Sequence, residues 1–283
     1  MTFSIVGYDP ATHEVGVAVQ SKFPCVGSVV PWAKAGVGAI ATQAWANPTY
    51  GPDGLRLLEE GHSVDEVVRI LTAADEGADD RQFGIIDAAG HAASFTGARC
   101  MDWAGGLVGE NFACQGNILV SGKTVEAMVA AFRDTPGDLA ERLTMALMAA
   151  AEAGGDSRGM QAAALYIAKE NGGYLGNNDR YVDIRVDENP DPIVELRRIL
   201  KLYRILFYKP KPENIIDLTG ETKDYILGEL IRRGYYTGDV GDAWNEQAQQ
   251  ALGAFYSTEN FEERLCDFGK IDREVVDYLK TLG

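Results

Sequence analysis

The residue that follows Met1 is a threonine, and a threonine at the start of a mature chain can carry out acyl transfer without a histidine. If Met1 is removed, Thr2 carries a hydroxyl and a free α-amine on the same residue. An α-amine has a pKa of about 7.7–8.0, so near neutral pH it can take the proton of the hydroxyl. Thr2 would then act as nucleophile and general base together. The alternative is structural, because a small residue after Met1 is also an ordinary start for an edge strand.

The first segment of the chain has the pattern of a β-hairpin. Residues 3–7 are rich in β-forming types, an Asp-Pro turn follows, and residues 14–20 alternate small and branched side chains. Thr2 therefore stands at the beginning of the first strand, and the polar residues 20–22 stand at the end of the second.

Further along the chain, strand-like and helix-like segments come in blocks. Strands are predicted at 36–42, 82–87, 92–96, 111–115, 161–168 and 183–186, and helices at 54–60, 64–73, 123–133, 139–153 and 193–208. This order favours sheets and helices stacked in layers, because a doubly wound α/β fold would need regular alternation of strands and helices.

The composition excludes several classes of function. Acidic residues outnumber basic ones by 42 to 26, a formal charge of −16, so nucleic acid is not expected as a partner. The four cysteines lack metal-binding spacing and there are three histidines, so neither a metal site, a cofactor nor a disulfide framework is predicted. We recognise neither a signal peptide nor an apolar run that could cross a bilayer, and we therefore predict a cytoplasmic protein without a membrane partner.

Several stretches resemble one bacterial and archaeal family of the N-terminal-nucleophile (Ntn) hydrolase superfamily, a family known as a domain of unknown function. They lie between Thr2 and about Leu200 and read TFSIVGYDP, GVAVQSKFP, VPWAKAGVGAIATQAWANPTYGPDGL, CQGNIL, AGGDSRGMQAAAL and RYVDIRVDENPDPIVELRRIL. The resemblance implies an α+β fold for residues 1–208, a four-layer αββα sandwich. It also implies an amide-bond hydrolase with Thr2 as nucleophile and a small-molecule or peptide amide as substrate.

The resemblance also implies roles for residues near the nucleophile. The superfamily places a catalytic lysine on the strand that follows the hairpin, but the corresponding segment 38–43 contains no lysine. Two alternatives follow from this departure. Either Lys22 lowers the pKa of the nucleophile from a shifted position, or Thr42, Gln43 and Asn47 provide a polar network without a cation. As a structural residue, Lys22 would be a solvated side chain at a strand end.

Two further positions match the superfamily pattern. Asn117 ends the segment Cys-Gln-Gly-Asn and would hydrogen-bond the N-terminal amine or the hydroxyl, and Asp156 would hold the α-ammonium or a lysine. As structural residues, Asn117 would form a turn and Asp156 would pair with Arg158. The superfamily's serine position is occupied by Gly159. The predicted catalytic residues are Thr2, Lys22, Asn117 and Asp156, and the predicted substrate contacts are Gln20, Ser21, Thr42, Gln43, Asn47 and Gln115.

Residues 209–283 resemble a three-helix peptidoglycan-binding module. An amphipathic helix at 222–233 leads into GYYTGDVGD, a second helix follows, and Ile-Asp opens the last helix. The stiff segment Lys-Pro-Lys-Pro places the domain boundary after residue 208. Tyr235, Tyr236 and Trp244 are the candidate glycan-binding residues, and a muropeptide is the candidate ligand. The alternative is a small helical bundle that packs against the first domain and binds nothing.

Two functions therefore remain open. The first is an amide-bond hydrolase that acts on peptidoglycan-derived peptides or small acyl amides. The second is a non-catalytic binding protein that keeps the Ntn fold, with a C-terminal module that binds glycan fragments or another subunit. A homo-oligomer is compatible with both. Removal of Met1 discriminates between them, because only the first function requires a free amine on Thr2.

Overall fold

The computed structural model describes residues 2–282, which form two compact units, Met1–Arg198 and Ile199–Gly283. The division lies within helix α5 (Pro192–Phe207). A domain boundary after residue 208 stays a prediction. Among residues 2–282, no helix combines the length and apolar character needed to cross a membrane.

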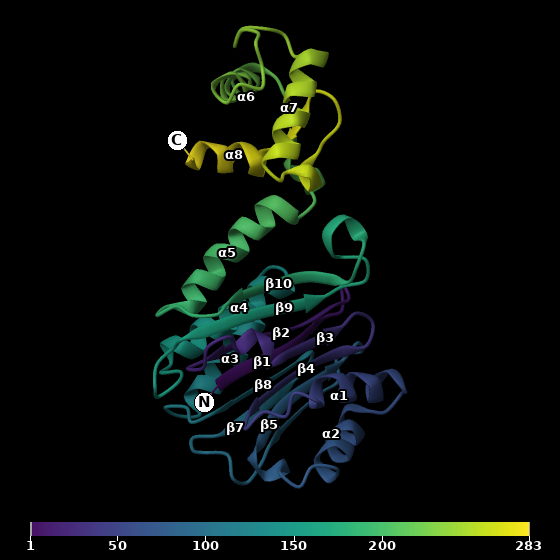
Figure 1. The fold of residues 1–283 in the computed structure, drawn as a ribbon, viewed down its shortest axis with the longest axis vertical. Helices are drawn as coiled ribbons and strands as arrows, with labels where there is room; N and C mark the ends of the chain where they lie inside the picture. The colour runs from purple at the N-terminus through teal and green to yellow at the C-terminus, as the bar shows by residue number, and fades with distance from the viewer. Residues whose placement is uncertain (1, 283) are drawn as a thin grey trace. The chain divides into compact units, whose positions relative to one another are not determined.

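Two antiparallel sheets form the centre of the first unit (Figure 1). The larger sheet has the strand order β10 (Arg180–Val186), β9 (Ala162–Ala168), β2 (Glu14–Ser21), β1 (Thr2–Asp9), β8 (Phe112–Asn117) and β7 (Gly105–Gly109). The smaller sheet has the order β3 (Pro31–Lys34), β4 (Gly38–Ala44), β5 (Arg81–Asp87) and β6 (Ala92–Thr96). Neighbouring strands in both sheets are paired antiparallel.

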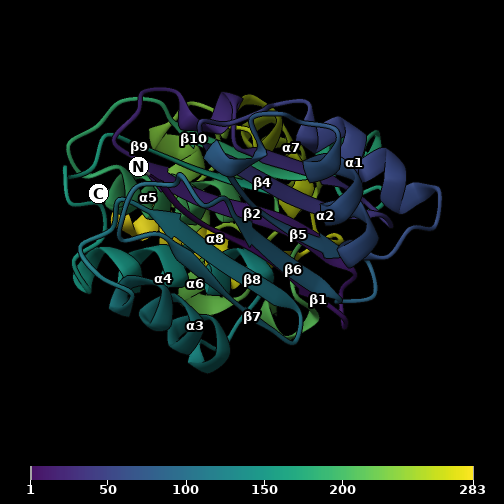
Figure 2. The ribbon, with the colours of Figure 1, turned by 90° about the horizontal axis from the view of Figure 1, so that it is seen from below.

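Helices cover the two outer faces of this pair of sheets, as Figure 2 shows. Helices α1 (Tyr50–Glu59) and α2 (Val64–Ala73) pack on the smaller sheet, and α3 (Lys123–Asp134) and α4 (Leu139–Glu152) pack on the larger one. Helix α2 starts with the capping box that its sequence predicts, since Ser63 and Glu66 exchange hydrogen bonds. The four-layer αββα fold implied by the resemblance is confirmed.

The inner faces of the two sheets pack against each other through small and branched side chains. Val17 and Val19 of β2 belong to this inner layer together with Ala41 of β4. Because side chains alternate between the two faces of a strand, Ser21 points to the same inner layer. Thr2 is its register partner on β1 and shares that face.

One edge of the sheets gathers several strand ends. Strand β1 begins there, strands β2, β4 and β8 end there, and strand β5 begins there. We call it the N-terminal edge. Antiparallel pairing is the physical reason for this arrangement, because the start of each strand must lie beside the end of its neighbour.

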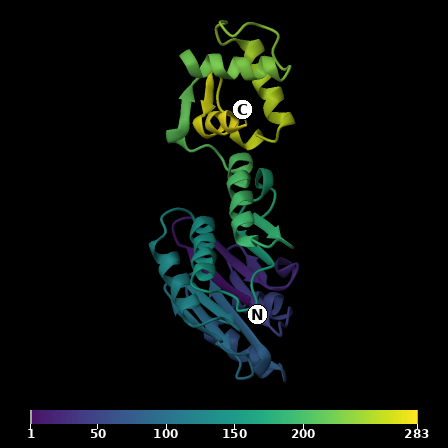
Figure 3. The same ribbon diagram turned by 90° about the vertical axis from the view of Figure 1, so that its left-hand side faces the viewer.

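The second unit is helical, with one short pair of strands (Figure 3). Its elements are β11 (Ile215–Asp217), α6 (Gly220–Arg232), α7 (Glu246–Thr258), β12 (Lys270–Asp272) and α8 (Arg273–Thr281). The predicted small helical domain is therefore confirmed. Its buried core includes Ile226, Leu227, Leu230, Leu252, Phe255, Tyr256, Ile271, Val275 and Leu279. In addition, both units contain short 3-10 helices. Those of the first unit are Val26–Ser28, Ala78–Asp80 and Tyr174–Gly176, and those of the second are Pro212–Asn214 and Glu262–Arg264.

A buried arginine lies at the centre of the second unit. Arg264 is 1% exposed, and its Nη1 donates to carboxylate oxygens of Asp272 at 2.5 Å and Glu274 at 2.9 Å. Its other nitrogens donate to the backbone carbonyls of Arg204, at 2.5 Å, and Ile205, at 3.0 Å. These carbonyls belong to the last turn of α5, where a helix provides few backbone donors. The carbonyl of Arg204 also accepts the backbone N–H of Tyr208 at 3.1 Å. One side chain thus joins that helix end to the start of α8.

Candidate functional site

The N-terminal edge brings together residues that are far apart in the sequence. Thr2, the first residue of β1, pairs with Ser21 on one side and with Asn117 on the other. On the facing sheet, Gln43 pairs with Gln82 at the same edge. The structure thus places Asn117, one of the predicted catalytic residues, directly beside Thr2.

The hydroxyl of Thr2 is buried and hydrogen-bonded. Thr2 is 6% exposed, and its Oγ1 lies 3.0 Å from the hydroxyl of Ser21. Within the described residues, no ammonium, imidazole or carboxylate group hydrogen-bonds this hydroxyl. A proton acceptor for it would therefore have to be the α-amine of Thr2 itself.

A network of side-chain amides lies beside Thr2 in the layer between the sheets. The Oε1 atom of Gln82 accepts hydrogen bonds from Nε2 of Gln43 and Nδ2 of Asn117, both at 2.8 Å. The Nε2 atom of Gln82 donates to the carbonyl of Gly116 at 2.7 Å. Because its bonds to Gln43 and Asn117 are buried, Gln82 fixes the orientation of these two amides.

The network continues to the backbone of Thr2. The hydroxyl of Ser4 donates to Oε1 of Gln43 at 2.6 Å and accepts from Nε2 of Gln115 at 2.6 Å. Nε2 of Gln43 also lies 3.3 Å from the carbonyl oxygen of Thr2. Gln43 and Gln115, both predicted as substrate contacts, therefore hold the strand that carries Thr2.

Two residues next to this network have strained backbones. Ala44, which follows Gln43, has φ of 67°, and Ile118, which follows Asn117, has φ of 51°. Residues other than glycine rarely adopt this left-handed region, and a β-branched residue such as isoleucine does so least readily. Backbone strain of this kind concentrates at functional sites, so its presence at the ends of β4 and β8, one in each sheet, supports a site at this edge.

Lys22 and Asp156 lie close to each other but do not contact the Thr2 hydroxyl. The backbone N–H of Lys22 donates to Oδ2 of Asp156 at 3.2 Å, while its exposed ammonium group donates to the carbonyl of Met160. Asp156 also accepts the backbone N–H of Arg158 at 2.8 Å, and the Arg158 guanidinium lies 3.4 Å away. These contacts match the structural alternatives, a solvated lysine and an aspartate paired with arginine.

The structure does not bring Thr42 and Asn47 into the amide network. Thr42 is on the opposite face of β4 from Gln43, because neighbouring residues of a strand point to opposite sides. Its hydroxyl donates to the carbonyl of Asn47 at 3.1 Å. The Asn47 amide donates to Asp75, on the side of the sheet that α1 and α2 cover.

Gln20 also lies on the wrong face for a contact with substrate at Thr2. It precedes Ser21 on β2, so its side chain points to the α3 and α4 layer. It is fully buried, and both atoms of its amide have no hydrogen-bond partner among the described residues.

A matched pair of substitutions tests the amide network. Gln82→Met should lower the free energy of unfolding by about 2–3 kcal/mol, because it removes the acceptor of the buried Asn117 amide and leaves the Gln43 amide with only its longer contacts to backbone carbonyls. Gln20→Met should be neutral or stabilising, since it removes two buried groups that have no partner. Urea unfolding of both variants measures the difference. Equal losses in the two variants would contradict the assignment.

Asp75 is the centre of a second polar cluster, which holds the loop between β4 and α1. Its carboxylate accepts hydrogen bonds from Arg81 Nε at 2.8 Å, Tyr50 Oη at 3.0 Å and the Gly77 N–H at 2.8 Å. The hydrogen bond from Arg81 is the main cause that holds the pKa of Asp75 well below its ordinary value. Burial, followed by the hydrogen bond to Asp75, raises the pKa of Tyr50.

The depressed pKa makes the contribution of Asp75 to stability depend on pH. A carboxyl whose folded pKa is below its unfolded value of about 3.9 stabilises the protein above that value and loses the effect in acid. Asp75→Asn should therefore cost about 1–3 kcal/mol at neutral pH and progressively less toward about pH 3. Urea unfolding at each pH measures this gap, with the exposed Asp134→Asn as control. A gap that stays constant with pH would refute the prediction.

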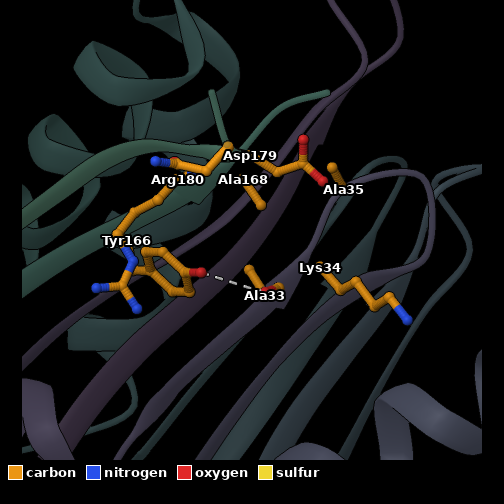
Figure 4. Close-up of a pocket in the computed structure, with 8 residues that line it drawn as sticks. Ala33, Lys34, Ala35, Tyr166, Ala168, Asp179 and Arg180 are labelled. Carbon is orange, nitrogen blue, oxygen red and sulfur yellow. Dashed lines mark hydrogen bonds between the residues drawn. The ribbon is translucent and has the colours of Figure 1, made fainter. Parts of the chain in front are cut away.

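A surface cavity of about 430 Å³ lies away from this edge (Figure 4). Tyr166 and Arg180 line it, together with Ala168 of β9. Ala168 pairs with Val15 near the start of β2, whereas Ser21 is at the end of that strand, roughly 20 Å further along. The cavity is thus separate from the site around Thr2. Among residues 2–282, no group of three His, Cys, Asp or Glu side chains is placed to hold a metal ion.

The predicted glycan-binding residues of the second unit differ in exposure. Tyr236 is buried in the core at 3% exposure, and its hydroxyl donates to Asp242, so its ring has no face free to stack on a sugar. Tyr235 and Trp244 are partly exposed. Trp244 donates from its indole nitrogen to Gln249 at 2.9 Å. The structure therefore leaves Tyr235 and Trp244 as the accessible aromatic residues of the predicted set.

Comparison with known families decides the relationship of the first unit. Residues 2–196, more than half of the chain, match the model described as "Family of unknown function (DUF1028)". The chain belongs to this family. In this DUF1028 protein, residues 206–279 also match the model described as "Putative peptidoglycan binding domain". Both resemblances seen in the sequence are thus confirmed. No curated protein matches the chain significantly.

Two solved structures are similar to this DUF1028 protein. A crystal structure of a DUF1028 protein from Silicibacter pomeroyi matches 79% of this chain and 92% of its own, with 28% identity and a TM-score of 0.66. Thiobacillus denitrificans BPH, in complex with epoxomicin, matches 60% of this chain and 98% of its own, with 15% identity and a TM-score of 0.36. The second likeness is too distant to bear on function.

Sequence reasoning missed two residues of the site, Ser4 and Gln82. Both are polar residues at inward-facing positions, beside apolar inward residues of the same strands such as Val6 and Ile86. A buried polar residue requires partners, so such a position signals a buried network. That signal can be seen only when the inward face of each strand is known.

Proposed function

We propose that the DUF1028 unit is an amide-bond hydrolase of the Ntn type, with Thr2 as its nucleophile after removal of Met1. The observation that carries this proposal is the position of the Thr2 hydroxyl at the N-terminal edge, between Ser21 and Asn117. The chemistry needs a hydroxyl, an amine and hydrogen-bond donors at one point, and these strand ends would supply them once Met1 is removed. Met1 itself lies outside the described residues.

The reaction has two steps. The Thr2 hydroxyl oxygen attacks the amide carbonyl carbon while the α-amine takes the hydroxyl proton. The carbon–nitrogen bond then breaks, the amine product leaves with that proton, and the acyl group remains as an ester on Thr2. Water, activated by the same α-amine, hydrolyses the ester, which releases the carboxylic acid and restores the hydroxyl.

The amide of Asn117 is suited to stabilise the oxyanion of this reaction. Its Nδ2 carries two hydrogens, and one of them is donated to Gln82. The other can be donated to a substrate oxygen at Thr2. Because Gln82 holds the amide in place, the donor would not have to reorient as charge develops. Ser21, whose hydroxyl is 3.0 Å from that of Thr2, would keep the nucleophile oriented.

We infer that the second unit brings glycan-linked substrates, such as muropeptides, to the protein. The match of residues 206–279 to a peptidoglycan binding domain supports this, as do the accessible aromatic rings of Tyr235 and Trp244. Aromatic rings bind sugars through their apolar faces and their polar tips. The cytoplasmic location stays a prediction of the sequence.

The second candidate is a non-catalytic binding protein with the same fold. Two observations favour it: the hydroxyl of Thr2 is nearly inaccessible, and Lys22 directs its ammonium to Met160. In that case Met1 would be retained, and the polar residues at the N-terminal edge would serve stability alone.

The intact mass of the native protein and labelling by a threonine-directed β-lactone together test the proposal. We expect a mass that lacks Met1 and one molecule of lactone attached to the peptide that begins with Thr2. The same chain with an N-terminal tag is the control, because the tag blocks the amine. A native protein that retains Met1 would support the binding protein instead.

A further inference from the structure

Five large apolar side chains are exposed on the segments that continue from the N-terminal edge. They are Phe23, Trp45, Met101, Trp103 and Val120, with exposed fractions of 37–73%. We call them the apolar rim. Single exposed apolar residues are common on protein surfaces, whereas a group of them beside a polar site marks a binding surface.

Backbone hydrogen bonds connect part of the apolar rim directly to the strand end at Asn117. The N–H of Ile118, the next residue, donates to the carbonyl of Met101 at 2.9 Å. The N–H of Leu119 donates to the carbonyl of Trp103 at 3.0 Å, and Trp103 donates back at 3.4 Å. These two rim residues therefore lie beside the residues that directly follow the predicted oxyanion donor.

Trp45 is held on the other side of the edge by a fixed main chain. Its N–H donates to the carbonyl of Asp80 at 3.2 Å, and its own carbonyl accepts from Arg81 Nη1 at 2.6 Å. The backbone of the preceding residue, Ala44, has the left-handed conformation. Trp45 is nevertheless 73% exposed. A large ring in solvent on an immobilised and strained backbone is poised to contact a ligand.

An ion pair connects two of the segments that carry the apolar rim. The guanidinium of Arg99 donates to both carboxylate oxygens of Asp80, at 2.9 and 2.7 Å, so the segment that leads to Met101 meets the one that holds Trp45. Phe23 lies two residues beyond Ser21, the partner of Thr2.

We propose that the apolar rim binds the acyl group of the amide substrate and that this group is a long or bulky hydrocarbon. The inference rests on the proposed function, because the position of Thr2 defines which end of the substrate reaches the rim. With the carbonyl at the Thr2 hydroxyl, an acyl chain leaves the buried polar network and meets apolar side chains. Contact with apolar surface stabilises a hydrocarbon by an amount that grows with its length, and a short or charged acyl group gains little.

Straight-chain N-acylglycinamides, from acetyl to decanoyl, are the probes for this proposal. Binding is measured by calorimetry on the full-length Thr2→Ala variant, which cannot be acylated. Affinity should rise up to about fourfold for each added methylene. Trp45→Ala in the same background should flatten this dependence, and Trp45→Tyr should largely restore it. Tyr174→Ala, an exposed aromatic residue outside the apolar rim, is the matched control and should leave the dependence unchanged.

The outcomes separate this proposal from the proposed function. If the wild type hydrolyses amides but binding does not depend on chain length, the assignment of the rim would be overturned. The assignment of Thr2 as nucleophile would still stand. Length-dependent binding that requires Trp45, without hydrolysis by the wild type, would support the rim and refute catalysis. Self-association of the wild type that Trp45→Ala abolishes would overturn the proposal, since the rim would then be an interface between copies of the chain.

Discussion

Thr2→Ala should reduce amide hydrolysis by about 10³-fold or more, while Thr2→Ser should retain measurable activity. The alanine variant has no oxygen that can attack a carbonyl carbon, whereas serine keeps a hydroxyl and an α-amine on one residue. Release of p-nitroaniline from acyl p-nitroanilides and the release of amine from muropeptides measure the rate. Intact mass confirms that each variant has lost Met1.

The fold of the Thr2→Ala variant should be preserved. The substitution removes one hydroxyl at a strand end, together with its hydrogen bond to Ser21, and costs about 0.5–1.5 kcal/mol. Asn117→Ala should lower the rate by about 10²–10³ if its amide stabilises the oxyanion. Undiminished hydrolysis by Thr2→Ala would exclude Thr2 as nucleophile.

Arg264→Met should destabilise the second unit by about 3–5 kcal/mol, the largest effect on stability that we expect in this protein. The substitution keeps an apolar stem in place but leaves the Asp272 carboxylate, which is inaccessible to solvent, without its counter-charge. It also removes the side-chain donor to the carbonyl of Ile205 and one of the two donors to the carbonyl of Arg204, which keeps the N–H of Tyr208. A buried charge without a partner is far more costly than an intact buried pair is favourable.

Hydrogen exchange of the α6, α7 and α8 amides in the full-length protein measures this loss in the second unit alone. Arg273→Met is the matched control, because Arg273 is an exposed arginine at the start of α8. It should change protection little. Similar exchange in both variants would show that the buried arginine does not hold the unit together.

Several helices and strands could be predicted from the sequence because the residues that determine them are close together in the chain. The hairpin of β1 and β2, the capping box of α2 and the long helices follow from side-chain alternation, capping residues and helical periodicity. Strands β3 and β7 were not predicted. Strand β7 contains three glycines in five residues, which resembles a loop, and it forms because β8 offers it backbone partners. Its stability comes from a neighbour that is adjacent in space.

The start of helix α1 also could not be predicted from the local sequence. The predicted helix begins at residue 54, after a cluster of turn-forming residues, whereas the helix begins at Tyr50. A side chain at Gly51 would collide with the ring of Trp32 on β3, since its Cβ would lie 2.2 Å from a ring carbon. Tertiary packing therefore explains why a glycine is accommodated in the first turn of this helix.

For the candidate site too, the sequence predicted some of the residues, and the tertiary structure decided the others. The sequence was sufficient to place Thr2 and Ser21 at the ends of the hairpin strands, because the antiparallel hairpin is a local consequence of its turn. It placed Asn117 in a turn, whereas the structure makes it the last residue of β8. Only the packing of the two sheets decided which polar residues meet, because it determines the inward face of every strand. Gln82 and Gln43 join the network from the second sheet, while Thr42 and Gln20 point away from it. Neighbouring residues on a strand face opposite sides, so one position in the sequence separates a partner in the site from a residue in another layer.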